Sequence, residues 1–234
     1  MAPPSVDMAS SPPPEESIEI QDHPDWQSGD FTLISSDGWR FKAPSYSLFH
    51  ASAVLRDAPA GGPLEITFTD ESIETKEVLE QFLSLVVHSR LVPRKEDDEL
   101  WKTVCKLIPG QTLDIFLDLI SFLHKYDCTP TLRSFCGEVL KFVSFEAISP
   151  LDGFALGAIA ADDDLCAASL AMVDFSSEGE GLKLGDIGAF VWERAGPRYL
   201  YALTKTKQSF EVDEDEDPVA RTFYYYLDRA ASKE

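Results

Sequence analysis

Residues 30–43 read DFTLISSDGWRFKA, and this stretch decides the fold of the N-terminal part of the chain. Apolar and polar residues alternate on both sides of Asp37-Gly38. An Asp-Gly pair between two such runs is a strong signal for a tight hairpin, because both central residues of a type I′ turn need positive φ. The stretch predicts an antiparallel hairpin, with Arg40 and Lys42 on one face of its second strand and Trp39, Phe41 and Ala43 on the other.

The pattern changes from strand to helix directly after the hairpin. Beyond Pro44, Leu48, Ala51 and Leu55 recur at helical spacing, and Gly61-Gly62-Pro63 then breaks the chain. Residues 64–68 alternate again as a short strand. The next helix is predicted to start at Ser72 as its N-cap, with Glu74 in the first turn, where the helix dipole favours an acid. The pattern therefore predicts an α+β domain.

Beyond Arg90 the pattern is helical to the end of the chain. Thr129-Pro130 and Ser149-Pro150 both indicate helix starts, since proline fits the first turn and the hydroxyl before it can accept from a free amide. Further helices are predicted at about 165–175, 186–194, 197–207 and 219–231, with loops at 176–181 and at the acidic run 211–217. The predicted organisation is a disordered Pro- and Ser-rich tail over 1–17, a first domain over 18–143 and an all-helical extension over 144–234.

Charge and composition limit the partners and the compartment. The chain of 234 residues has 20 basic and 41 acidic residues, a net charge of -21, which repels nucleic acid and anionic membranes. No apolar run reaches the ~18 residues of a membrane span, and the N-terminus lacks the pattern of a secretory signal. The four cysteines form no CxxC pair and are predicted to be reduced, buried thiols. We therefore expect a cytoplasmic or nuclear protein with no nucleic-acid or membrane partner.

Signals for chemistry are weak. No G-x-S-x-G nucleophile motif occurs, and the glycines at 179–185 do not have the spacing of a phosphate-binding loop. His124 and Cys128 are spaced to share a helix face, yet no second pair completes a metal site. The acidic runs 162–164 and 211–217 lack the ligand pattern of a calcium loop, which favours solvated or partner-facing surface. We expect a protein that is not an enzyme and has no cofactor and no metal; a divergent enzyme or small-molecule binder is the third alternative.

Further sequence motifs around this pattern resemble those of a known family. The hairpin followed by a helix, a lone strand and paired helices, together with His124–Leu132 (HKYDCTPTL), resembles the BTB/POZ family and its A-x-KYD-x-x-x-L segment. His23-Pro24-Asp25-Trp26 and the Ser-Ser-Asp-Gly turn resemble the fungal branch of that family, whose members often have a helical extension similar to residues 149–161. The resemblance covers residues 23–143 well and 144–175 loosely.

The resemblance implies a small, mainly antiparallel, three-stranded sheet covered by helical hairpins. It implies a protein-interaction module that associates with itself or with another BTB protein. A monomeric substrate adaptor of a cullin-type ubiquitin ligase is the alternative, although no clear hydrophobic-x-Glu signature follows the helix that ends near Val87. A transcription-related scaffold is a further reading. The family pattern includes no chemistry and no small-molecule substrate.

One departure from the family affects the expected interface. Pro44 and Ser45 stand where the family has His and a basic residue, and in many members that basic residue pairs with the aspartate that matches Asp30. Asp30 is therefore expected to lack its partner, which argues against a corepressor-docking role. The family's dimers pack the helix after the hairpin across a twofold axis, while Leu48 and Leu55 fit the domain core equally well. The resulting interface candidates are Asp30, Tyr46, Leu48, Phe49, Val54 and Leu55.

Overall fold

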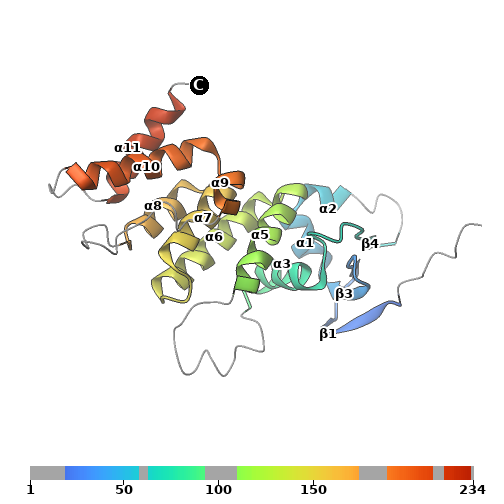
Figure 1. The fold of residues 1–234 in the computed structure, drawn as a ribbon. Coiled ribbons are helices and arrows are strands. Elements are labelled where there is room, and N and C mark those ends of the chain that lie inside the picture. Colours follow the sequence, from blue (N-terminus) through green and yellow to red (C-terminus); the bar gives the residue numbers. More distant parts are fainter. Residues whose placement is uncertain (1–18, 58–62, 93–109, 174–188, 213–218, 233–234) are drawn as a thin grey trace, which may run out of the picture.

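The computed structural model of the chain describes residues 19–57, 63–92, 110–173, 189–212 and 219–232. A small sheet lies at one end of the molecule, and a stack of helices leads from it to the C-terminus at the other end (Figure 1). This arrangement confirms the α+β class. The predictions for the tail at 1–17 and the loop at 176–181 lie outside the described residues.

The sheet has the strand order β1-β3-β2-β4, and its pairing is mixed. Among the strands of the described residues, only β2 (Phe31–Ile34) and β3 (Trp39–Ala43), the two strands of the hairpin, pair antiparallel. β1 (Gln21–Gln27) is parallel to β3, and β4 (Glu65–Thr67) is parallel to β2. The prediction of a mainly antiparallel, three-stranded sheet is therefore wrong. β4 reaches β2 through a helical crossover, and a crossover allows the parallel pairing that a tight hairpin turn forbids.

The hairpin turn differs from the predicted type I′ turn. Of Asp37 and Gly38, only Gly38 has positive φ, at 85°. The Gly38 N–H donates to the Ser35 carbonyl at 3.0 Å, and the Trp39 N–H donates to Ser35 Oγ at 2.8 Å. This matches a three-residue loop that ends in a glycine bulge. The Asp37 carboxylate is thereby free to accept the Lys76 N–H at 3.0 Å.

Asp37 consequently provides the cap that was predicted for Ser72. Helix α3 (Lys76–His88) begins three residues later than expected, after Thr75, whose side chain makes no capping bond. On its inner face Val78, Leu79, Phe82 and Leu83 are buried, whereas Val86, which the helical spacing predicts on the same face, is half-buried. An acceptor from the hairpin satisfies the first turn of α3 and joins the two elements.

The first core lies between the sheet and four helical segments. These are α1 (Ser45–Ala51) with its continuation α2 (Ala53–Asp57), α3, α5 (Gly110–Lys125) and α6 (Thr129–Ser144). Phe31, Leu33 and Phe41 of the sheet meet Leu79, Phe82, Phe122 and Phe135 of the helices in one buried cluster. The predicted start at Thr129-Pro130 is confirmed, although the Thr129 hydroxyl donates to Asp127 and does not cap the helix.

The second core joins α7 (Pro150–Ala160) and α8 (Asp163–Leu170) to the C-terminal helices α9 (Ala189–Arg194), α10 (Pro197–Val212) and α11 (Val219–Ala231). The predicted cap at Ser149 is confirmed, since its Oγ accepts the Asp152 N–H at 3.1 Å. α10 extends to Val212, so Glu211 of the acidic run is helical.

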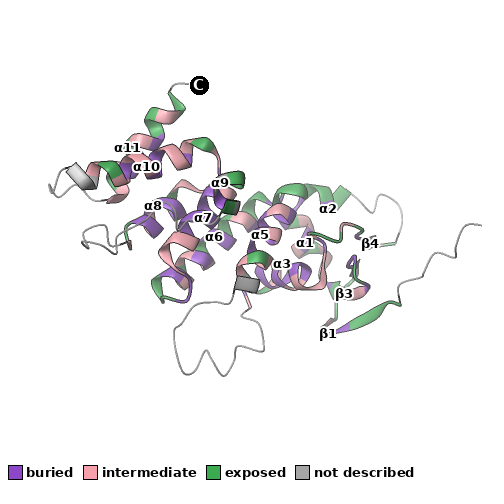
Figure 2. Cartoon of the chain, viewed as in Figure 1, coloured by how far each residue is buried: buried purple, intermediate pink, exposed green. Residues whose placement is uncertain are grey.

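Helix α7 belongs to both cores. Leu156 and Ala160 lie in the first cluster, whereas Phe154 and Ala158 lie in the second. Buried residues continue from α3 across α6 and α7 to α8 in Figure 2. Helix α7 therefore joins the part of the chain that contains the sheet to the C-terminal helices.

Candidate interaction surface

The carboxylate of Asp30 caps α1 from outside the helix. Asp30 Oδ1 accepts the Ser45 N–H at 2.7 Å, and Oδ2 accepts the Ser45 hydroxyl at 2.6 Å. Pro44, the residue at the N-cap position, has no side chain that can do this. The hydrogen bond from the Ser45 hydroxyl, followed by that from its backbone N–H, lowers the pKa of Asp30.

This contact corrects the expectation that Asp30 has lost its partner. Ser45, one of the two residues that depart from the BTB/POZ pattern, is itself the hydrogen-bond partner of Asp30. Asp30 is also exposed. The first turn of α1 is thus attached to the residue that precedes β2.

The break between α1 and α2 is made by the buried Ser52. Its N–H closes α1 on the Leu48 carbonyl at 3.0 Å, and its Oγ accepts the Leu55 N–H at 3.1 Å to start α2. The same hydroxyl donates to the Tyr126 carbonyl at 2.5 Å. The two short helices are therefore held at a fixed angle against the end of α5.

The six interface candidates do not share one environment. Leu48 and Leu55 are 0% and 1% exposed, so both belong to the core and neither presents a side chain to a partner. Phe49 is half-buried, with its ring edge-on to Phe31 at 5.7 Å. Tyr46 and Val54 are 74% and 44% exposed. We use the name α1–α2 surface for the exposed residues Tyr46 and Val54 together with the half-buried Phe49.

A separate network of contacts centres on Glu74, a buried carboxylate that was predicted to lie in the first turn of a helix. Glu74 is 2% exposed and lies in the loop between β4 and α3. Its Oε2 accepts the backbone N–H groups of Thr69 and Asp70 at 2.8 and 2.7 Å. Its Oε1 accepts the Tyr126 hydroxyl at 2.5 Å and lies 2.7 Å from Lys125 Nζ.

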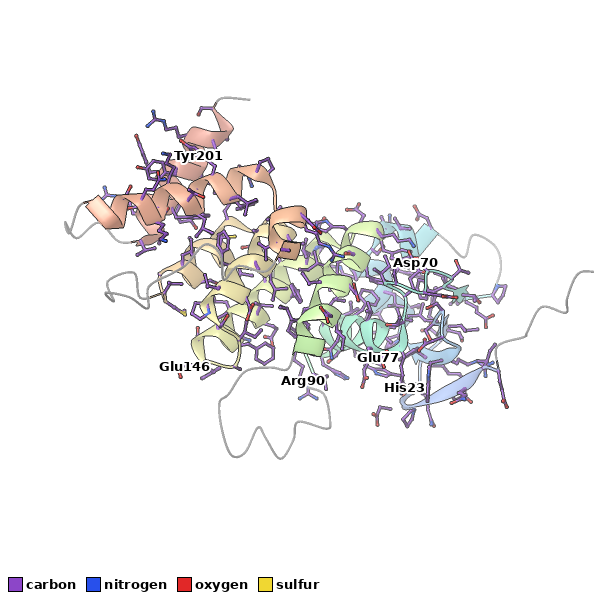
Figure 3. All side chains as sticks on the ribbon, viewed as in Figure 1. His23, Asp70, Glu77, Arg90, Glu146 and Tyr201 are labelled. Carbon is purple, nitrogen blue, oxygen red and sulfur yellow. The ribbon has the colours of Figure 1, made fainter. Side chains whose placement is uncertain are left out.

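Glu74 thus contacts both Lys125 and Tyr126 of the KYD segment. Burial raises the pKa of this carboxyl, but the hydrogen bonds from Lys125, Tyr126 and the two amides outweigh it and hold the pKa below its ordinary value. Lys125 also pairs with Asp70 at 2.9 Å, and Figure 3 places Asp70 at the sheet end of the molecule. In the sequence, Glu74 follows a predicted strand and Lys125-Tyr126 lie at the end of a predicted helix. No sequence pattern indicated that these residues contact one another.

The acidic run at 162–164 makes hydrogen bonds within the fold, and Asp164 is exposed. Asp162 Oδ1 accepts the Leu165 N–H at 2.7 Å and caps α8. Asp163 accepts from Arg198 at 2.9 Å and from the Tyr199 hydroxyl at 2.6 Å. Asp164 accepts the Tyr224 hydroxyl at 2.5 Å. These contacts attach α10 and α11 to α8.

The residues considered for metal binding are not brought together. His124 is exposed, while Cys128 is buried, and burial raises the pKa of its thiol to about 12. Within the described ranges, no group of three or more His, Cys, Asp or Glu side chains is placed to hold a metal ion. Within the same ranges, every helix is too short or too polar to cross a membrane.

Compared with known proteins, the chain matches no family model, and no curated protein and no solved structure gives a significant match. The resemblance to the BTB/POZ family is therefore carried by the quoted residues alone.

Proposed function

We propose that the chain is a non-enzymatic protein-interaction module of the BTB/POZ type. The support is the order of hairpin, two short helices, crossover strand and paired helices, together with a KYD segment tied to that crossover by Glu74. We propose that it acts in the cytoplasm or nucleus, and that its partner is a second copy of the chain or another BTB protein.

The α1–α2 surface is the observation that carries this proposal. Tyr46 is the most exposed of the large apolar side chains in the part of the chain that the structure describes, at 74%. It lies on a helix whose other side is core and whose first turn is fixed by Asp30. An exposed aromatic residue on a rigid element is typical of an interface centre, because little side-chain entropy is lost on binding.

The test is the oligomeric state of the full chain by size exclusion with light scattering over a wide concentration range. We expect association in the wild type and its loss in Tyr46→Glu/Val54→Glu, since a charge at the centre of an apolar contact leaves an unpaired buried carboxylate. Phe145→Glu is the matched control, because Phe145 is 67% exposed at the end of α6 and lies outside the surface. Leu48→Glu is unsuitable, because Leu48 is core.

A monomer at every concentration removes the self-association proposal. The alternative, a monomeric adaptor of a cullin-type ligase, then predicts capture of the cullin scaffold by the wild type. The absence of that capture as well would remove both readings.

A further inference from the structure

Helix α1 has two exposed side chains, Tyr46 and His50, and the rest of its residues are buried or half-buried. The helix lies at the sheet end of the molecule (Figure 1). Tyr46 and His50 are four positions apart, so they lie on the same face, one turn from each other. A partner that covers Tyr46 of the α1–α2 surface therefore covers His50 as well.

The charged groups around α1 are engaged elsewhere, and no ion pair among the described residues includes His50. On α2, Arg56 and Asp57 pair with each other at 3.2 Å, and residues 58–62 after it contain no charged residue. Asp30 accepts from Ser45 at the start of α1. The charged and titratable side chains of the two other helices that pack on α1 are Lys76, Glu77, Glu80 and His88 of α3 and Arg133, Glu138 and Lys141 of α6.

A contact at this face requires the neutral form of His50. Histidine is the side chain that changes its charge between about pH 5 and 8. A cation that is covered without an acid beside it loses its hydration and gains no ion pair, whereas a neutral imidazole packs well in an apolar contact. Association through this face therefore releases protons, so it is strongest at high pH and is lost as the pH falls.

We propose that His50 is a pH switch of self-association through the α1–α2 surface, and this inference rests on the proposed function. Two copies that pack α1 against each other cover two histidines, which steepens the pH dependence. The expected sign is opposite to that of the overall charge. The chain has a net charge of -21, so protonation of any of its four histidines reduces the repulsion between copies and by itself favours association. A weaker dimer at lower pH thus requires a specific group inside the contact.

The test measures the dissociation constant of the full-chain dimer by light scattering at about pH 8 and about pH 5.5, at one ionic strength. We expect the wild-type constant to rise about tenfold to a hundredfold at the lower pH, because keeping one histidine neutral a pH unit below its usual titration costs about tenfold and the dimer has two. His50→Gln should bind equally at both pH values, and His50→Arg, a permanent cation, should bind weakly at both. His88→Gln, at the exposed histidine that ends α3, is the control and keeps the wild-type pH dependence.

Two outcomes overturn the switch and leave self-association standing. These are a wild-type dimer that is as tight at the lower pH, and an equal loss of affinity in His50→Gln. A His50→Arg dimer as tight as the wild type at about pH 8 also overturns the switch, and this variant decides the question if circular dichroism shows that the chain unfolds at the lower pH. A wild type that is monomeric at about pH 8 removes the proposed self-association and, with it, the switch.

Discussion

Replacing Glu74 with glutamine isolates the buried carboxylate that holds the KYD segment. The side chain keeps its shape, but one oxygen that accepts two hydrogen bonds becomes an NH₂ group that faces the same two donors. If Oε1 is replaced, Lys125 Nζ and the Tyr126 hydroxyl lose their acceptor. Hydrogen bonds to a charged group contribute about 1.5–3 kcal/mol each. Lys125 retains Asp70 at 2.9 Å, so we expect the free energy of unfolding to fall by about 3–5 kcal/mol.

The assay is urea unfolding of the full chain at neutral pH, followed by circular dichroism. Glu65→Gln is the matched control, since Glu65 is an exposed glutamate on β4, and its unfolding free energy should stay within about 0.5 kcal/mol of the wild type. A loss below about 1 kcal/mol in Glu74→Gln, or an equal loss in the control, would refute the argument that Glu74 positions the segment.

The comparison of the wild type with Glu74→Gln also predicts how the free energy of unfolding depends on pH. The pKa of Glu74 is lower in the folded chain than its ordinary value of 4.5, so its contribution is present above that value and is lost as the pH falls through the folded pKa. Glutamine has no such contribution to lose. The difference in unfolding free energy between wild type and Glu74→Gln should therefore narrow once the pH falls below about 4.5; a constant difference would contradict the assignment.

Other substitutions test the backbone and the shared core by the same unfolding assay. In Gly153→Ala the new methyl group would lie 2.5 Å from Val143 Cγ2, and this overpacking should lower the free energy of unfolding by about 1–3 kcal/mol. The higher helix propensity of alanine should oppose that loss by about 1 kcal/mol. In Gly137→Ala the new methyl group meets nothing within 4 Å, so this variant should show the gain alone. Equal effects of the two would contradict the close packing of α7. Gly29→Ala would place a methyl group 2.3 Å from the Ala43 carbonyl carbon and should destabilise by about 3 kcal/mol, a prediction that a neutral result would reject. Ala161 has φ of 57° and is exposed, so Ala161→Gly should stabilise by about 1 kcal/mol, and any loss of stability would count against the left-handed assignment.

Elements whose signals are local were predicted well. Alternation of apolar and polar residues predicted the two hairpin strands. The Ser-Pro pair predicted the capped start of α7 at Ser149, and apolar periodicity predicted the bounds of α11. Each of these signals lies within a short stretch of sequence. The partners of charged residues were predicted poorly. Asp37, Asp30 and Asp163 each bind a group that is 15 or more residues away in the sequence, and no local pattern contains such a pair.

The candidate surface shows the same division. Helical spacing placed Leu48 and Leu55 on one stripe and left open whether that stripe was core or interface, because apolar periodicity reports only that a face is covered. The three-dimensional packing assigned both to the core and left Tyr46 and Val54 outside.

The sequence by itself determined the α+β class, most helix positions and the strongly acidic character, because each depends on composition or on neighbours along the chain. Tertiary structure alone decided the mixed pairing of the sheet, the burial of Glu74 behind the KYD segment and the sharing of α7 between two cores. These features depend on which distant segments meet, and the free energy that selects them comes from packing and hydrogen bonding between those segments.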